Sequence, residues 1–330
     1  MLTENLRKAI IYLNNDQSWW LPAKPAADLA LQIGPLKPYP VDLTPRLDDG
    51  HFAVKDDKGI PQKDFGGTIG RVYNITRVCG YALANCDRYM HTAKDENAEI
   101  FIKCAKWLRD NADVSATHGL VVRYRYPYKT LKPGRISGLA QGQLLSVFTR
   151  AYFLTGDSQW KSLAGLTTKV FLLPVEEGGV RALFEPTNVD WYEEDPDTKC
   201  HILNGQIYAL IGLREAAVHL ELSDLKQLYD YGLNALTKSL QFFDCGYWSY
   251  YSYPKNQPLY VASYSYHWMH CILLKHLSEL HPDIEVLEQF AHRWHQYCDK
   301  RRFRLRAGLR MGWQKMRRYS YGRIFVGNLI

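Results

Sequence analysis

Apolar residues recur at helical spacing along most of this 330-residue chain, in four similar pairs of segments. Each pair begins with a segment that is apolar nearly all round and continues, after a short break, as an amphipathic segment. The pairs are expected at 74–90 with 95–111, 138–154 with 157–171, 203–220 with 224–243, and 264–280 with 283–298. Repetition of one helix pair is typical of stacked helical hairpins.

The two segments of a pair differ in the face that they bury. In the third pair, the segment IYALIGL (207–213) is apolar all round, as expected of a helix that is covered on every side. Its partner places Leu225, Leu228, Tyr229, Leu233, Leu236 and Leu240 on one face, which is typical of a surface helix. Inner and outer helices in alternation predict an all-α fold: an (α/α) toroid or incomplete barrel of helical hairpins, with short β-strands or hairpins at one end.

Three regions are expected along the chain. Prolines interrupt residues 1–65, which we interpret as an N-terminal extended arm packing on the main domain, after one short helix near 2–15. Its apolar residues, among them Ile33 and Phe52, require burial. Residues 66–300 would form the α/α toroid, and 301–330 a basic C-terminal tail. Aromatic strands are expected at 121–128, 180–186 and 247–254, each following a glycine.

Composition restricts the class of protein. Hydrophobic residues make up 46% and charged residues 23% of the chain, as in ordinary globular proteins. The first residues lack the apolar region of a signal peptide, so we expect a cytoplasmic protein. The seven cysteines are odd in number and form no C-x-x-C motif, which favours reduced, buried thiols over disulfides or a zinc site.

Positive charge is concentrated at the C-terminal end. Ten of the 41 Lys and Arg residues lie within 300–323, and no Asp or Glu occurs from 300 to 330. Such a segment favours a polyanion: an acidic lipid surface, an acidic polysaccharide or nucleic acid. The alternative is a solvated terminus with no dedicated partner.

Candidate chemistry gathers in an aromatic region and an acidic turn. Nine of the 22 positions from 247 to 268 are aromatic, which suits a cleft for sugar rings, although an aromatic core is the alternative. In WYEEDP (191–196), three successive carboxylates, Glu193, Glu194 and Asp195, would raise one another's pKa if held together. That would suit a general base; the alternative is a solvated acidic turn.

Two histidines share a helix face, but a metal site is not expected. His267 and His270 are three residues apart, and no third ligand is evident, so we interpret them as hydrogen-bonding residues. His292 and His295 are expected on the surface. No nucleotide-binding or serine-hydrolase motif occurs, so neither a nucleotide cofactor nor serine hydrolysis is expected.

Several motifs in consistent order resemble one family. These are the segments 133–157, WYEEDPDTKCHILNGQIYALIGL (191–213), FDCGYWSYYS (243–252) and YHWMH (266–270). Together, roughly over residues 50–298, they resemble the catalytic domain of D-glucuronyl C5-epimerases. The resemblance implies an α/α toroid that inverts carbon 5 of D-glucuronosyl residues to L-iduronosyl in a heparosan-like polysaccharide, without a cofactor, by proton abstraction and reprotonation.

The resemblance also implies residue roles. Glu194 and Tyr266 would be the opposed proton-transfer pair, with Tyr251 in support. The substrate-binding residues would include Tyr73, Asn74, Tyr192, Asp195 and Tyr250. Five more would position the substrate or support the residues that bind it: Gln141, Gln143, Asn204, His267 and His270. From charge and position alone, we add Arg123 and Arg125 as cations for uronate carboxylates.

Two departures from the family pattern favour a different polymer substrate. Asp195 stands where the family commonly has tyrosine, and Arg135 where it has an aromatic residue. The alternatives are a uronate polysaccharide lyase acting by C5 proton abstraction and β-elimination, or an inactive polysaccharide-binding homologue. Expected partners are an acidic polysaccharide and, through the basic tail, an anionic membrane surface or biosynthetic glycosyltransferases. The protein could then lie peripherally on the inner face of the membrane and form a homodimer. Nucleic acid is not an expected partner.

Overall fold

The computed structural model describes residues 12–17, 20–129, 131–255 and 257–321. Most of the helix expected at 2–15 and the end of the tail, 322–330, lie outside these residues. The chain divides into two compact units: a hairpin unit of residues 22–201 and 205–236, and a C-terminal unit of 1–21, 202–204 and 237–330. The three regions expected from the sequence stay a prediction.

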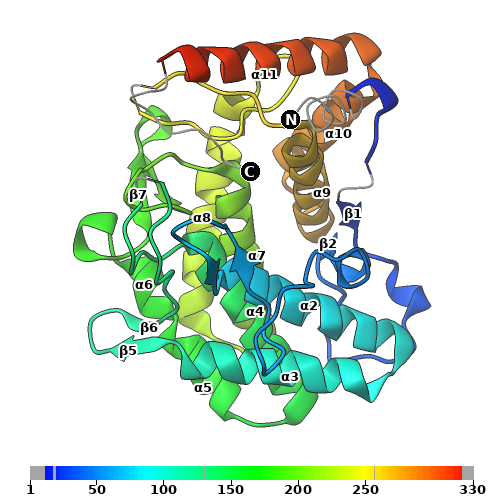
Figure 1. Cartoon of the computed structure of the whole chain (residues 1–330), viewed down its shortest axis with the longest axis vertical. Coiled ribbons are helices and arrows are strands. Elements are labelled where there is room, and N and C mark those ends of the chain that lie inside the picture. The colour runs from blue at the N-terminus through cyan, green and yellow to red at the C-terminus, as the bar shows by residue number, and fades with distance from the viewer. Residues whose placement is uncertain (1–11, 18–19, 130, 256, 322–330) are drawn as a thin grey trace. The chain divides into compact units, whose positions relative to one another are not determined.

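The helix pairs occur where the hydrophobic pattern predicts them (Figure 1). Their bounds are α2 Ile75–Thr92 with α3 Asp95–Asp110; α4 Gly138–Thr155 with α5 Gln159–Leu166 and α6 Thr168–Leu172; α7 Leu203–His219 with α8 Ser223–Ser239; and α9 Tyr264–Leu280 with α10 Glu285–Asp299. One more helix, α11, spans Arg301–Tyr321. All four pairs are confirmed, with the second member of the second pair divided at Thr167.

Local sequence explains where the inner helices begin and end. The Asn74 side chain accepts a hydrogen bond from the Arg77 backbone N–H (3.0 Å) and starts α2. Ser137 caps α4 in the same way. Helix α4 ends at Gly156, whose φ of 70° is the left-handed conformation that glycine adopts without strain.

The inner helices of the hairpin unit pack directly on one another. Helix α4 is buried from Gly138 through Ala151 and contacts α2. Helix α4 also contacts α7 through one glycine of each helix, Gly142 and Gly212. A Cβ on Gly212 would lie 1.8 Å from the carbonyl oxygen of Gly142. Backbones can approach this closely only where no side chain intervenes. This packing of inner helix on inner helix is that of an α/α toroid, so the predicted fold class is confirmed.

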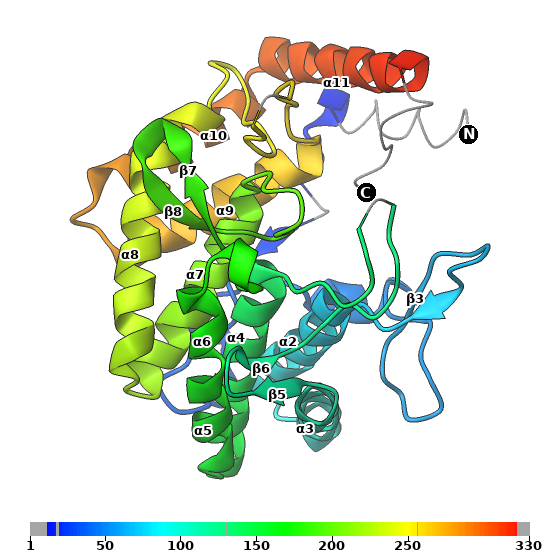
Figure 2. The same ribbon diagram turned by 90° about the vertical axis from the view of Figure 1, so that its left-hand side faces the viewer.

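The outer helices bury one stripe each, as predicted. All six apolar residues expected on one face of α8 or just after it are buried. On α10, Leu287, Ala291, Trp294 and Cys298 are buried while His292 and His295 are exposed. Helix α3 packs against α2, and Figure 2 shows α3 nearly end-on at the outside of the hairpin unit.

The strands are shorter than the aromatic segments that predicted them. Their bounds are β1 Leu21–Pro22, β2 Val41–Asp42, β3 Lys63–Asp64, β4 Arg71–Val72, β5 Asp113–Ser115, β6 Gly119–Val121, β7 Arg181–Phe184 and β8 Val189–Tyr192. Antiparallel pairs join β3 to β4, β5 to β6, and β7 to β8. The strand expected at 121–128 ends at Val121, and residues 247–254 form only isolated bridges. Aromatic segments of this kind predict an extended backbone, but a β-ladder also requires a partner strand of similar length.

A buried ion pair ties the arm to the hairpins. Ile33 and Phe52 of the arm are buried, as expected. Arg150 of α4 is fully buried and donates two hydrogen bonds to Glu215 of α7, at 2.6 and 3.0 Å. Its guanidinium also donates to the carbonyl oxygen of Lys37 in the arm (3.3 Å). One side chain thus connects three segments that are distant in sequence.

All seven cysteines are free thiols, as expected. Five are buried, whereas Cys200 and Cys245 are partly exposed, which corrects the expectation for those two. Among the helices of the described residues, none has both the length and the apolar character needed to cross a bilayer.

Candidate functional site

The acidic turn after β8 is built around a buried glutamate. The backbone N–H of Glu193 donates to the Val180 carbonyl, and its carbonyl accepts from the Gly138 N–H, both at 2.7 Å. Its carboxylate is fully buried, pairs with the His201 imidazole and accepts the His201 backbone N–H at 3.0 Å. Glu193 is therefore occupied in holding the turn.

The next residue, Glu194, lies against the first turn of α7. A Cβ on Gly205 would lie only 2.7 Å from the Cβ of Glu194 and 3.0 Å from its Oε2. Burial, reinforced by the carboxylates of Asp195 and Glu193, raises the pKa of Glu194 to about 8. A carboxyl group whose pKa is near neutrality can both accept and release a proton.

Asp195 follows in the same turn and titrates together with Glu194. Burial raises the pKa of Asp195, while the guanidinium of Arg135 opposes the shift. Because one ionised carboxylate disfavours the ionisation of the other, Glu194 and Asp195 release their protons in two steps that belong to the pair. The predicted acidic cluster is therefore partly buried and mutually coupled.

An arginine stacked on tyrosines belongs to this site and was not among the predicted residues. The Arg135 guanidinium lies 4.7 Å from the ring centre of Tyr124 and 5.2 Å from that of Tyr126, and donates to the Tyr126 carbonyl at 2.9 Å. Burial raises the pKa of Tyr124, and the charge of Glu194 adds to that shift. The signal in the sequence was the departure from the family pattern at Arg135.

A basic cavity of about 270 Å³ adjoins the turn. Arg123, Lys132 and Arg135 line it, with Pro196 and Asp197 at the side of the acidic turn. Arg123 and Arg125 each pair with Asp113, at 3.1 and 2.6 Å. The predicted cations Arg123 and Arg125 therefore share one counter-ion, and only Arg123 reaches the cavity. The lining of the cavity carries three cations and one carboxylate, Asp197, and this excess of positive charge suits an anionic ligand.

Four of the predicted substrate-binding residues have fully buried side chains: Gln141, Tyr192, His267 and His270. Their role at the site stays a prediction. The Gln141 amide donates to the Val122 carbonyl (3.0 Å), and the Tyr192 hydroxyl to the Leu228 carbonyl (2.8 Å). These two hydrogen bonds support the fold around the site.

The other predicted residues of the hairpin unit have structural partners. Asn74 caps α2 and donates to the Tyr126 hydroxyl (2.9 Å), which connects it to the stack under Arg135. The Tyr73 hydroxyl donates to Asp56 (2.7 Å), and this bond raises the pKa of Tyr73 to about 12. Gln143 is buried within α4.

The C-terminal unit holds the predicted tyrosines. The rings of Tyr251 and Tyr266 meet edge to face, 4.8 Å apart between centres. The Tyr251 carbonyl accepts the N–H of Leu203, next to the buried Asn204 at the start of α7. Glu194 belongs to the hairpin unit, whereas Tyr251 and Tyr266 belong to the C-terminal unit.

An arginine of α11 also reaches the aromatic segment. Arg310 donates to the hydroxyl of Tyr247 (3.1 Å) and lies within 3.5 Å of the hydroxyl of Tyr250. The two segments are about 60 residues apart in the sequence, and no local pattern connects them. The predicted ligand-binding residue Tyr250 is thus partly engaged by a cation of this chain.

His267 lies in a group with two thiols, but it has no free nitrogen for a metal. The ligand atoms of His267, Cys271 and Cys298 all lie within 4.8 Å of one another. Nδ1 of His267 accepts the Ser249 N–H (3.0 Å), which leaves Nε2 to donate to the Trp294 carbonyl (3.1 Å). A metal would have to break one of these buried bonds, so the predicted hydrogen-bonding role is favoured.

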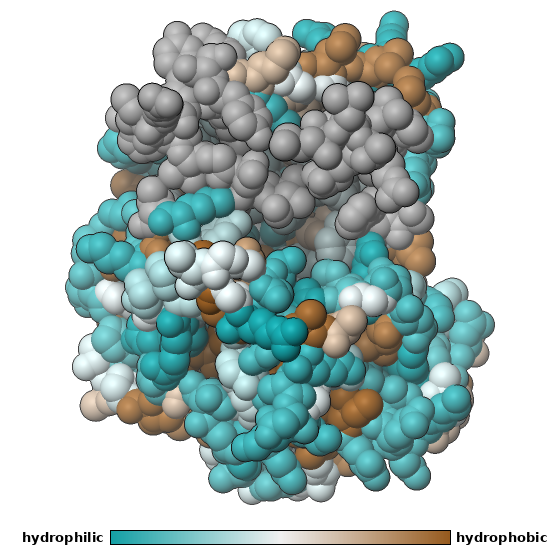
Figure 3. Space-filling view, in the orientation of Figure 1, coloured by the Kyte–Doolittle hydropathy of each residue, from teal (hydrophilic) through white to brown (hydrophobic). Residues whose placement is uncertain are grey.

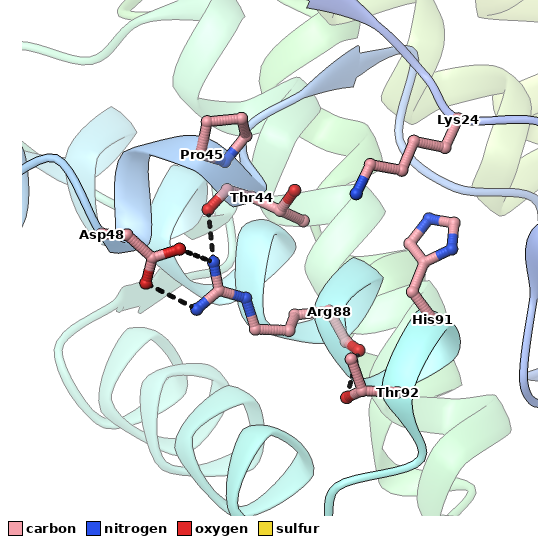
Figure 4. A pocket seen from close by; sticks show the side chains of 7 residues that line it. All are labelled: Lys24, Thr44, Pro45, Asp48, Arg88, His91 and Thr92. Carbon is pink, nitrogen blue, oxygen red and sulfur yellow. Dashed lines mark hydrogen bonds and ion pairs between the residues drawn. The ribbon is translucent and has the colours of Figure 1, made fainter.

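A second cavity, of about 240 Å³, lies beside the arm (Figure 4). Its lining includes Lys24, His91 and Arg88, and Arg88 donates to Asp48 and to the Thr44 carbonyl. Arg88 is therefore already satisfied by partners within the arm. This cavity holds no paired carboxylates and contributes no candidate chemistry.

Comparison with known proteins identifies a family. Residues 113–296 match the family model described as the D-glucuronyl C5-epimerase C-terminus. The chain is 29% identical over 223 residues to a D-glucuronyl C5-epimerase of Caenorhabditis elegans, which is 62% of this chain and 36% of that protein. It is also 29% identical over 150 residues to an uncharacterized protein of Methanocaldococcus jannaschii, 43% of this chain and 49% of that one.

Solved structures also match this chain, at low sequence identity. A family 76 α-mannanase of Bacteroides thetaiotaomicron matches with a TM-score of 0.46 and 10% identity, covering 78% of this chain and 71% of the other.

The chain spans between a third and a half of the length of the two curated relatives. The matched region includes β5 to α9 and most of α10, and with it the acidic turn, the basic cavity and the tyrosines. The chain therefore belongs to the D-glucuronyl C5-epimerase family, through the C-terminal region of that family.

Proposed function

We propose that this protein is an epimerase that inverts carbon 5 of D-glucuronosyl residues in an acidic, heparosan-like polysaccharide. The observation that carries the proposal is the environment of Glu194. Its carboxyl group is held by α7 and by a buried neighbour, and its pKa is raised to about 8. A base poised near neutrality is what removal of a weakly acidic proton requires.

The reaction is a proton abstraction followed by reprotonation. The ionised carboxylate of Glu194 takes the proton from carbon 5, and the C–H electron pair moves into the adjacent carboxylate of the sugar, which gains negative charge. Arg123, Lys132 and Arg135 line the basic cavity beside the turn and would stabilise that charge. A proton delivered to the other face of carbon 5 restores the C–H bond with inverted configuration.

The second proton transfer is assigned to Tyr266, with Tyr251 in support. Support for this role comes from the family motif and from the ring contact between the two tyrosines in the C-terminal unit. The phenol donates its proton to carbon and recovers one from solvent, while Glu194 releases to solvent the proton that it took. The enzyme thus returns to its starting state without a cofactor.

The test measures solvent deuterium at carbon 5. Heparosan is incubated with the protein in deuterated water, and NMR follows both exchange and the appearance of iduronosyl signals. Glu194→Gln and Tyr266→Phe should each lose most of the exchange. Glu99→Gln and Tyr231→Phe change exposed residues of the same types and should keep it.

The same experiment separates the other functions. Chain cleavage with formation of an unsaturated uronate would indicate a lyase. Binding of heparosan without deuterium incorporation would indicate an inactive polysaccharide-binding homologue. Full exchange in both Glu194→Gln and Tyr266→Phe would overturn the proposed residues.

A further inference from the structure

Helix α11 is attached to the C-terminal unit by one of its faces. Arg304 is buried and donates through Nε to the Tyr12 carbonyl (2.9 Å) and through a terminal nitrogen to the Asp299 carbonyl (3.0 Å). Ala307 is fully buried, and the Gln314 amide donates to the Leu259 carbonyl (3.3 Å). The basic segment is thus a docked helix with a defined outer face.

The outer face of α11 presents an apolar stripe. Leu305, Leu309, Trp313 and Met316 follow one another at intervals of four, four and three residues, which places them on one side of a helix. Their exposed fractions are 38%, 77%, 51% and 62%. Single exposed apolar residues are ordinary, but a continuous stripe marks an interaction surface.

Cations flank this stripe, and residues 300–330 include no acidic residue. Arg301, Arg302 and Arg306 are exposed on the same helix, and no acidic residue follows Asp299 in the chain. At the upper edge of Figure 3, where α11 lies in Figure 1, hydrophobic and hydrophilic side chains adjoin each other. We call Leu305, Leu309, Trp313 and Met316 with these three arginines the α11 surface.

We propose that the α11 surface binds an anionic membrane, with the apolar stripe inserted at the boundary of headgroups and acyl chains. An acidic polysaccharide would satisfy the arginines, but it offers no apolar phase for leucine and methionine side chains. A lipid bilayer offers both an anionic surface and an apolar interior, and helices that combine these two kinds of residue lie in its interface. This surface is independent of the proposed epimerase activity.

The test is flotation of the full chain with phosphatidylcholine vesicles, with and without phosphatidylglycerol. The protein should float with the anionic vesicles and remain behind with the neutral ones. Leu309→Ser combined with Met316→Ser should weaken binding at least about tenfold, because both side chains leave the acyl boundary. Arg301→Gln, Arg302→Gln and Arg306→Gln together should weaken it on the order of a hundredfold.

Matched controls separate this surface from general stickiness. Val114→Ser combined with Leu172→Ser removes two apolar residues of similar exposure from the hairpin unit and should leave flotation unchanged. Equal flotation of Leu309→Ser/Met316→Ser and the unchanged protein would overturn the proposal. So would loss of heparosan binding, with vesicle binding intact, in the triple arginine variant, since the surface would then serve a polysaccharide.

Discussion

Replacement of Gly205 by alanine tests the position of Glu194 without changing any titratable group. The added Cβ would lie 2.7 Å from the Cβ of Glu194 and 3.0 Å from its Oε2. Carbon atoms in contact prefer about 3.5–4.0 Å, so the overlap is about 1 Å. The glutamate side chain must move away from α7 by about that distance.

The expected consequence is a loss of rate with little change in stability. A misplacement of about 1 Å at a reacting group costs about a hundredfold in rate. Alanine favours the helix by up to about 1 kcal/mol over glycine, which offsets part of the about 1–3 kcal/mol cost of overpacking. Deuterium exchange at carbon 5 of heparosan should therefore fall about a hundredfold while urea unfolding changes only slightly.

Gly165→Ala is the matched control for this experiment. Gly165 lies within α5, and no atom lies within 4 Å of the Cβ that alanine would add. This variant should keep the exchange rate and be slightly more stable. An unchanged exchange rate in Gly205→Ala would refute the reasoning, since Glu194 would then be either displaced without effect or not the base.

Three further predictions concern buried charges. Arg150→Met leaves the carboxylate of Glu215 unpaired and should lower the free energy of unfolding by about 3–5 kcal/mol, measured in urea. Exchange at carbon 5 should rise with pH through the pKa of Glu194, about 8, because only the ionised carboxylate accepts a proton. The variant Asp195→Asn lacks a neighbouring negative charge, so the pKa of Glu194 should fall and the rise in exchange should move to lower pH. Burial raises the pKa of Asp87 from 3.8 to about 7, so the folded state retains a proton that the unfolded chain releases. The stability of the unchanged protein, relative to Asp87→Asn, should fall on the order of 4 kcal/mol between about pH 4 and 7, followed by thermal unfolding.

Each of these predictions has an outcome that contradicts it. Arg150→Met combined with Glu215→Leu should recover much of the lost stability, because no buried charge stays unpaired; a double variant as unstable as the single one points to packing instead. Coincident pH profiles of the unchanged protein and Asp195→Asn would show that the two carboxyl groups are not coupled. Parallel curves of stability against pH for the unchanged protein and Asp87→Asn would show that Asp87 does not retain a proton in the folded state.

The helical hairpins could be predicted because their signal is local. A helix that is covered all round, such as α4, and one with a single buried stripe, such as α8, differ in which positions of each turn are apolar. Breaks such as Gly156 mark the helix ends within a few residues. The acidic turn around Glu194 could likewise be identified, because three adjacent carboxyl groups next to apolar residues are unusual chemistry for a surface.

The roles of individual side chains depended on contacts between distant segments. Tyr192 and His267 have suitable chemistry for sugar binding, yet their partners Leu228 and Trp294 lie 36 and 27 residues away and occupy their polar atoms. The pairing of Arg150 with Glu215, across 65 residues, was equally hidden. Local periodicity specifies which face of a helix is buried, but only the packed structure decides which polar atoms meet, because that depends on positions that no short stretch of sequence contains.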